Sequence, residues 1–134
     1  MMAVALGTAS HLASKRLTLA KVSETRDYFW SALKDAFGDA VIQNGDLESR
    51  LPNTLNVSFI GRDGSKILEQ LEGFAASTGS ACHEDSVTMS PVLAAMGLSD
   101  NVAMGAIRFS VGDATTPDEI DLTMKSLAAV VPTV

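Results

Sequence analysis

Two short segments of the chain alternate apolar and polar residues, and this alternation restricts the fold more than any other feature of the sequence. Residues 54–59 and 106–111 place apolar side chains at every second position, which is the period of a half-buried strand. In the second segment, Arg108 and Ser110 fall on the polar face. A third, β-prone segment at 40–43 precedes a turn signal. We therefore expect these segments to join one small sheet.

Helical patterns flank the strands at both ends of the chain. Residues 3–37 contain no proline and one glycine, and their apolar residues recur at helical spacing. We expect one long helix or two joined helices over about 3–37. Towards the C-terminus, Thr116, Pro117 and Glu119 have the spacing of a capping box with proline at the first helical position. The apolar face of this last helix consists of Ile120, Met124, Leu127 and Val131.

The remaining elements are short. Residues 65–73 predict a helix, and residues 74–76 predict a brief strand that enters a long loop. Ser90 followed by Pro91 predicts another short helix, because the hydroxyl can cap it and proline tolerates the first helical position. We expect one domain over residues 1–134. Its fold class is α+β, a two-layer sandwich of helices on a small, mostly antiparallel sheet.

Composition and charge exclude several classes of partner. Hydrophobic residues make up 46% of the chain, yet no uncharged apolar run reaches the ~18 residues needed to span a bilayer. The net charge of −6 argues against nucleic acid, whose binding normally needs a basic surface to displace counterions from phosphates. A single cysteine cannot form an internal disulfide, which favours a cytoplasmic location. We expect a soluble protein whose partners are small molecules or proteins.

The single cysteine, Cys82, ends a segment rich in glycine and serine that begins at Ser77. A free cysteine usually behaves as a small buried hydrophobe. Its neighbours here favour an exposed loop instead, in which the thiol would be available as a nucleophile. His83 could help to deprotonate the thiol, whereas Glu84 and Asp85 would oppose thiolate formation. Both interpretations stay open on these residues alone.

Arg108 and the residues after Cys82 each allow a structural and a functional interpretation. Arg108 is either an exposed strand arginine or a binder of a carboxylate, which its planar guanidinium can hold with two parallel hydrogen bonds. His83, Glu84 and Asp85 follow the thiol, but adjacent side chains of an extended loop alternate in direction. The other histidine, His11, lies in the first helical segment. A solvated loop is therefore favoured over a zinc site.

Four motifs together resemble a known family. They are residues 50–59, 77–82, 106–112 and 115–121. With these motifs the chain resembles, from its first helix to its last, the C-terminal small domain of pyridoxal-phosphate-dependent cysteine desulfurases in the class V aminotransferase group. It is also similar to the selenocysteine lyase branch of that group, through Ala81-Cys82-His83 and Ser90-Pro91-Val92-Leu93. The α+β sandwich expected above is the fold that this resemblance implies.

The resemblance implies specific roles for three residues. Cys82 matches the loop thiol that attacks the sulfur of the substrate cysteine and leaves as a persulfide, with alanine as the other product. Arg108 matches the arginine that holds the substrate carboxylate. Asn53, within the first motif, is implied to bind substrate. The family's role in sulfur transfer, including iron–sulfur cluster assembly, is implied as well.

The cofactor site of the family is not found in this sequence. In the complete enzyme a large domain binds pyridoxal phosphate through a Schiff-base lysine that follows a histidine, and no lysine of this chain follows a histidine. We therefore expect this chain alone to bind no cofactor and to be inactive. The chain begins about where the small domain of the full enzyme begins, so it is expected to be a gene fragment, an excised piece or a naturally separate small domain.

Three partner arrangements follow from this interpretation. A separately encoded large domain would complete the enzyme. Alternatively, the chain is a persulfide acceptor or regulatory partner of a complete desulfurase, with the possibility that it delivers sulfur to an acceptor protein. The third alternative is a selenocysteine lyase-type fragment or an inactive relic, whose exposed apolar surface would be covered by self-association. No membrane or nucleic-acid partner is expected.

Overall fold

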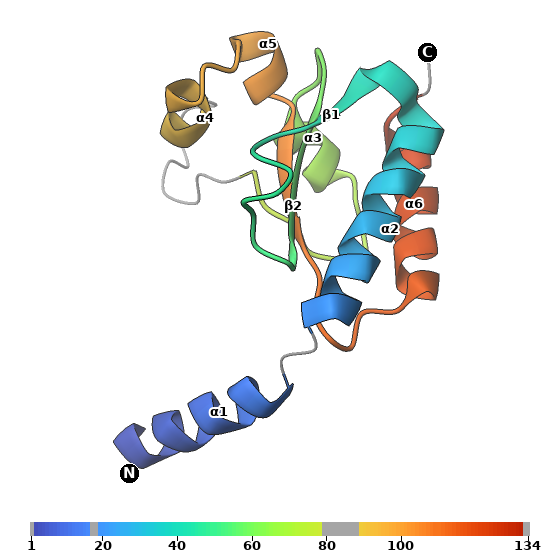
Figure 1. The fold of residues 1–134 in the computed structure, drawn as a ribbon. Helices are drawn as coiled ribbons and strands as arrows, with labels where there is room; N and C mark the ends of the chain where they lie inside the picture. Colours follow the sequence, from blue (N-terminus) through green and yellow to red (C-terminus); the bar gives the residue numbers. More distant parts are fainter. Residues whose placement is uncertain (1, 17–18, 79–88, 133–134) are drawn as a thin grey trace.

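The computed structural model of the chain describes residues 2–16, 19–78 and 89–132. The described residues form helices and a three-stranded sheet (Figure 1). In chain order the elements are α1 (Met2–Arg16), α2 (Leu19–Phe37), the 3-10 turn η1 (Gly38–Ala40), β1 (Val41–Gln43), β2 (Thr54–Phe59), α3 (Gly64–Glu69), α4 (Pro91–Ala95), α5 (Asp100–Ala103), β3 (Ala106–Ser110) and α6 (Pro117–Val130).

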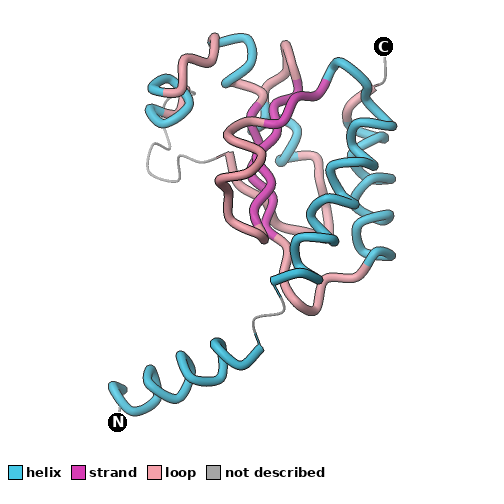
Figure 2. The backbone as a smooth tube through the Cα atoms, viewed as in Figure 1, coloured by secondary structure: helices cyan, strands magenta, loops and turns pink. Residues whose placement is uncertain are grey.

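The sheet is antiparallel throughout and has the order β1-β2-β3. Strand β2 is central, with Val57 opposite Gln43 of β1 and Ile107 of β3. The expected strands at 40–43, 54–59 and 106–111 are therefore present, and the expected α+β class is confirmed. Helices α2 and α6 lie side by side on one face of the sheet (Figures 1 and 2).

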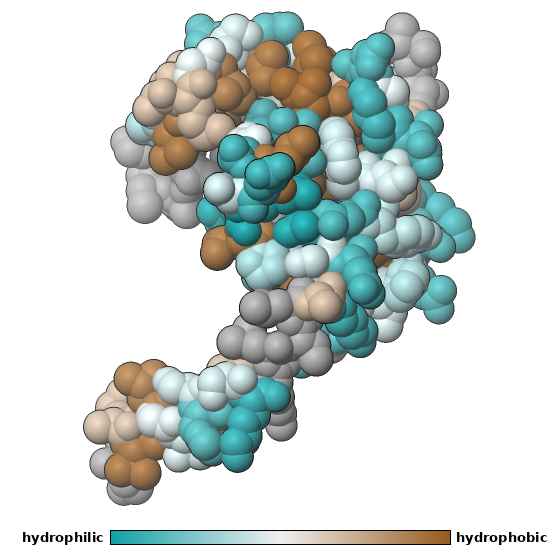
Figure 3. All heavy atoms as spheres, viewed as in Figure 1, coloured by the Kyte–Doolittle hydropathy of each residue, from teal (hydrophilic) through white to brown (hydrophobic). Residues whose placement is uncertain are grey.

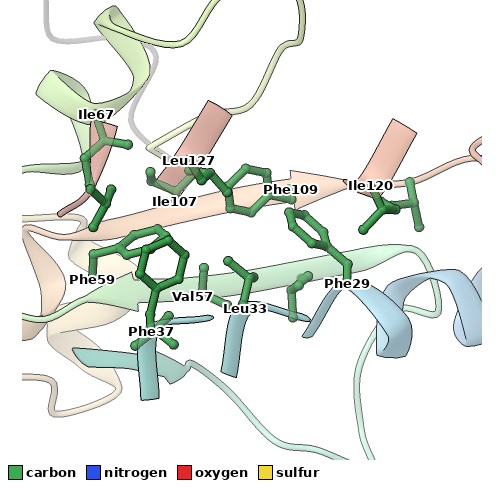
Figure 4. Close-up of a cluster of buried hydrophobic side chains, with 14 of the residues drawn as sticks. Phe29, Leu33, Phe37, Val57, Phe59, Ile67, Ile107, Phe109, Ile120 and Leu127 are labelled. Carbon is green, nitrogen blue, oxygen red and sulfur yellow. The ribbon is translucent and has the colours of Figure 1, made fainter. Parts of the chain in front are cut away.

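Aromatic and aliphatic side chains between the sheet and these two helices form the main core. Phe29 of α2 meets Phe109 of β3 edge to face, with ring centroids 5.0 Å apart, and Phe37 meets Phe59 of β2 in the same way at 5.5 Å. Such edge-to-face pairs stabilise a core beyond the area they bury. Figure 4 shows the side chains of α2, β2, β3 and α6 directed toward one another. The fully buried members include Leu33, Leu55, Val57, Ile107 and Leu127.

A smaller apolar cluster covers one end of β3 on the opposite face of the sheet. Leu93 of α4 and Ala103 of α5 pack there against Ala106, with Met89 and Leu98 at the edge. Gly105, just before β3, allows its backbone to approach β2, since an added Cβ would lie 2.0 Å from the carbonyl oxygen of Phe59. Only part of this face is covered, because Arg108 and Ser110 further along β3 are exposed.

Local signals in the sequence determined the start of α6. The side chain of Thr116 accepts a hydrogen bond from the backbone N–H of Glu119, and the Glu119 carboxylate accepts one from the backbone N–H of Thr116. This is the expected capping box, which satisfies backbone donors that the helix itself leaves unpaired.

Two short segments differ from the sequence-based expectation. The helix expected over 65–73 ends at Glu69, and the strand expected at 74–76 is absent. The next residue, Ser77, forms an isolated bridge with Arg108. Helix α5 was not expected. Elements of four to six residues carry too little periodicity to be recognised from the sequence alone.

Helix α1 contributes nothing to either apolar cluster. All its side chains from residue 2 to residue 15 are exposed, including Met2, Val4 and Leu6. Figure 1 shows α1 extending away from the sheet, and Figure 3 shows apolar residues gathered on it. Within the described residues, no helix is both long and apolar enough to cross a bilayer.

A substitution at Leu127 tests how much α6 contributes to the stability of the core. Leu127 is fully buried, so Leu127→Ala should leave a cavity and lower the free energy of unfolding by about 2–5 kcal/mol. Leu122 lies on the same helix but is 61% exposed, so Leu122→Ala should change it by less than about 0.5 kcal/mol. Urea unfolding followed by circular dichroism measures both. Equal losses in the two variants would contradict the packing described above.

Tyr28, the single tyrosine of the chain, links α2 to α6. Its hydroxyl donates a hydrogen bond to Asp121 Oδ1 at 2.6 Å, and this bond raises the pKa of Tyr28 above its ordinary value of 10.0, with smaller contributions from burial and the charges of Asp121 and Asp118. The folded state therefore holds the phenol proton more tightly than the unfolded state. The resulting stability is complete below the unfolded pKa and is lost as the pH rises through the folded pKa.

A spectroscopic titration can test this link directly. The phenolate absorbance of the folded chain should appear at higher pH than in the urea-unfolded chain. Asp121→Ala should bring the two midpoints closer together, because it removes both the hydrogen-bond acceptor and the negative charge, whereas Asp118→Asn should lower the folded midpoint less. A folded midpoint equal to the unfolded one in the unmodified chain would show that the hydrogen bond is absent in solution.

Candidate functional site

Arg108 lies on the face of the sheet opposite to α2 and α6. Its neighbours Ile107 and Phe109 are buried in the main core, so the pleat turns Arg108 to the other side, where it is exposed. Its guanidinium makes no hydrogen bond or ion pair with any residue of the described ranges. None of the described residues therefore competes with an external anion for this guanidinium.

The backbone of Arg108 is bonded to the segment that leads to the cysteine. Its N–H donates to the carbonyl oxygen of Ser77 at 2.6 Å, and the N–H of Ser77 donates to the carbonyl oxygen of Arg108 at 3.1 Å. Ser77 begins the expected Ser77–Cys82 segment. The structure thus fixes the first residue of that segment beside the arginine.

Several predicted site residues lie outside the described residues. These are Cys82 and the three residues that follow it, His83, Glu84 and Asp85. The roles expected for them stay predictions.

Asn53 lies in the turn before β2 and is half-buried. Its carbonyl oxygen accepts a hydrogen bond from the N–H of Val111 at 2.9 Å, and its side-chain oxygen accepts one from Thr54 Oγ1 at 3.2 Å. Asn53 is opposite Val111, so it lies three residues, about 10 Å, along the strands from the position of Arg108. No hydrogen bond links Asn53 with Arg108 in the described part of the chain.

A charged cluster holds the turn that contains Asn53 against α2. The guanidinium of Arg26 is 8% exposed; its Nη1 donates to the carbonyl oxygens of Leu51 and Pro52 at 3.2 and 3.1 Å. Its Nε and Nη2 bind Asp27 Oδ1 at 2.9 and 2.8 Å. Arg50 Nη2 reaches the same carboxylate oxygen at 3.2 Å. Both ends of the turn are thus tied to one helix.

The role of Arg26 was missed from the sequence, although a signal was present. Arg26 falls within an apolar helical pattern, with Val22 before it and Phe29 and Leu33 after it. A charged residue on the buried face of a helix requires polar partners, because an unpaired buried charge is strongly unfavourable. The sequence could not identify which carbonyl groups those partners would be.

Hydrogen bonds also stabilise the first part of the segment that connects β1 with β2. Asp46 Oδ1 accepts hydrogen bonds from the backbone N–H groups of Ser49 and Glu48 at 2.6 and 2.7 Å, and these bonds lower the pKa of Asp46. Asn44, two residues earlier, donates from its backbone N–H to the carbonyl oxygen of Asn56 in β2 at 2.9 Å.

The lysines of the chain do not fit a pyridoxal phosphate site. A Schiff-base lysine needs an enclosed pocket, and every lysine side chain here is exposed. Lys21 Nζ bonds the carbonyl oxygen of Asp113, and Lys34 Nζ bonds the carbonyl oxygen of Gly38 and the carboxylate of Asp39. The five exposed lysines are Lys15, Lys21, Lys34, Lys66 and Lys125.

Comparison with curated proteins confirms the resemblance to the small domain of a cysteine desulfurase. The chain is 40% identical over 124 residues to the cysteine desulfurase IscS of an Enterobacter species, and 41% identical over 123 residues to that of Klebsiella pneumoniae. These matches cover 91% and 90% of this chain. The chain spans about 30% of the length of both relatives. No protein-family model matches it.

Solved structures show the same fold. A NifS-like protein superposes with a TM-score of 0.72 at 28% identity, covering 92% of this chain and 30% of the other. A NifS-like protein from Rickettsia africae gives a TM-score of 0.77 at 22% identity, over 92% of this chain and 32% of the other. At 22% identity the second match supports the fold alone.

Arg26 should be required for the geometry of the turn. Arg26→Met keeps much of the stem but leaves two carbonyl groups without their donor, so we expect a loss of about 2 kcal/mol or more in the free energy of unfolding. Arg50→Met removes one contact to a half-exposed carboxylate and should cost less than about 1 kcal/mol. Urea unfolding measures the losses, and amide NMR shifts of residues 51–53 report the turn. A larger loss in Arg50→Met than in Arg26→Met would refute this assignment.

Proposed function

We propose that this chain acts as the small domain of a cysteine desulfurase, with Cys82 as the thiol that accepts sulfur and Arg108 as the residue that binds the carboxylate of the substrate cysteine. One observation carries the proposal. The backbone pairing of Ser77 with Arg108 holds the start of the cysteine-bearing segment beside an exposed guanidinium. The similarity to cysteine desulfurases over 91% of the chain supports the same assignment.

The proposed sulfur transfer balances without an external oxidant or reductant. The sulfur of the substrate leaves its carbon and forms a sulfur–sulfur bond with Cys82. Of the two thiol protons, one stays on the outer sulfur of the persulfide and the other ends on the methyl carbon of alanine. The exposed lysines provide no site for pyridoxal phosphate, so the chain is proposed to be inactive alone and to act beside a large domain that holds the cofactor.

Arg108 suits the carboxylate role because its position is fixed. Strand β3 is bonded on both sides, to β2 and to Ser77, so the guanidinium projects from a rigid element. Its planar donors can form two parallel hydrogen bonds to one carboxylate, which a lysine cannot reproduce. Asn53 is proposed to bind substrate on the strength of its motif, and sulfur is favoured over selenium by the names of the relatives. A cytoplasmic location is proposed.

Reconstitution tests the proposal. The whole chain would be mixed with the large domain of a cysteine desulfurase, pyridoxal phosphate and L-cysteine, and alanine formation would be measured. We expect alanine from the mixture but not from this chain alone. Cys82→Ser should abolish sulfur transfer. Arg108→Lys should lower kcat/KM about ten- to a hundredfold through loss of the paired hydrogen bonds, whereas Arg62→Lys, a surface control, should leave it unchanged.

Three outcomes would contradict the proposal. Turnover by this chain alone would show that a cofactor is bound here after all. If no turnover occurs in the mixture but Cys82 gains the mass of one sulfur atom from a complete desulfurase, the chain is a persulfide acceptor. If neither reaction occurs and the chain only self-associates, it is an inactive relic.

A further inference from the structure

Asn56 of β2 lies directly across the sheet from Arg108. Both the N–H and the carbonyl oxygen of Arg108 bond to Ser77 on its other side, so Asn56 and Arg108 form a non-hydrogen-bonded pair of the antiparallel ladder. Side chains approach most closely in such pairs, with Cβ atoms about 4.5–5.5 Å apart on one face. The side chains of Asn56 and Arg108 therefore leave the sheet at adjacent positions on the same face.

A second asparagine fixes the orientation of the Asn56 amide. Asn44 Nδ2 donates hydrogen bonds to Asn56 Oδ1 at 2.8 Å and to Ser58 Oγ at 2.7 Å. Asn44 follows β1, which lies on the opposite side of β2 from β3. Because Oδ1 is bonded to Asn44 on the β1 side, Nδ2 of Asn56 is directed away from Asn44 and is available to a ligand held by Arg108. Within the described residues, this Nδ2 has no hydrogen-bond partner.

The donor chemistry of the pair limits what can bind between them. A guanidinium has only donors, and the free end of the Asn56 amide also presents only donors. Two such groups cannot bond each other, but they can share an acceptor. A carboxylate offers two acceptor oxygens and the negative charge that Arg108 lacks among its described neighbours.

We propose that Asn56 is a second carboxylate-binding residue, which together with Arg108 forms a two-donor site whose orientation is set by Asn44. This inference rests on the proposed function, because it takes Arg108 as the carboxylate binder, and adds a neutral donor beside it. The guanidinium supplies the positive charge, and the amide supplies a second hydrogen-bond donor, whose orientation is fixed by Asn44. The carboxylate of the substrate is thus held at a defined angle over the polar face of the sheet.

The site can be tested on the whole chain without a cofactor. N-Acetyl-L-alanine serves as the probe, because it carries one carboxylate and no ammonium group that Arg108 would repel. In a ¹⁵N-labelled sample, the side-chain NH₂ signals of Asn56 and the Nε–H signal of Arg108 should shift together and give the same Kd. N-Acetyl-L-alaninamide, which lacks the carboxylate, should shift neither signal.

Variants separate the contributions of the two residues. Asn56→Ala should raise the Kd read from Arg108 about two- to tenfold, the range of one net hydrogen bond. Asn56→Asp is nearly isosteric and should abolish binding, since the new carboxylate pairs with Arg108 and repels the probe. Asn44→Ala leaves both donors but frees the amide, so its effect should be smaller than that of Asn56→Ala. Ser110→Ala, at the next exposed position of β3, is the matched control and should not change the Kd.

The NMR signals of Arg108 and Asn56 test the roles of these two residues separately. If the Arg108 signal does not respond to N-acetyl-L-alanine in the unmodified chain, the carboxylate-binding role of Arg108 fails. If Arg108 responds but the Asn56 signals do not, or if Asn56→Ala leaves the Kd unchanged, the role of Asn56 fails while that of Arg108 stands. The Asn56 reading in the unmodified chain keeps the test decisive even if a variant does not fold.

Discussion

The register between β2 and β3 is the constraint on which the other features of this structure depend. With Val57 opposite Ile107 and Asn56 opposite Arg108, one face of the pair is apolar and the other polar. A slip of one residue would turn Arg108 into the core and expose Ile107. The edge-to-face contact of Phe29 with Phe109 holds the register from the helical side, because it ties β3 to α2.

Hydrogen bonds from segments on both sides of the sheet hold the residues of its polar face in place. The bridge to Ser77 secures the backbone of Arg108 on one side, and the hydrogen bonds of Asn44 secure the β1 side. Arg26 anchors the turn before β2 to the helix behind the sheet. Polar side chains on the exposed face are thus attached to rigid elements, which is the condition for binding a ligand at a defined angle.

The chain spans about 30% of the length of the cysteine desulfurases that it resembles. Its exposed lysines lack the enclosure that a Schiff base requires, whereas its arginine and its cysteine-bearing segment are the parts that the proposed sulfur transfer takes from the small domain. The exposed apolar side chains of α1 are a further surface that the described fold does not use.

The sequence by itself determined the faces of the strands, the capping box of α6, and the resemblance from which the roles of Cys82 and Arg108 were predicted. These are properties of local spacing or of motifs, which can be read without knowing what packs where. Only the tertiary structure decided which residues contact one another. It places Asn56 across from Arg108 and Asn44 beside Asn56, and it brings the carbonyl groups of the turn to Arg26. A period of two gives the face of a strand but not its register, and register depends on pairing between segments far apart in the chain.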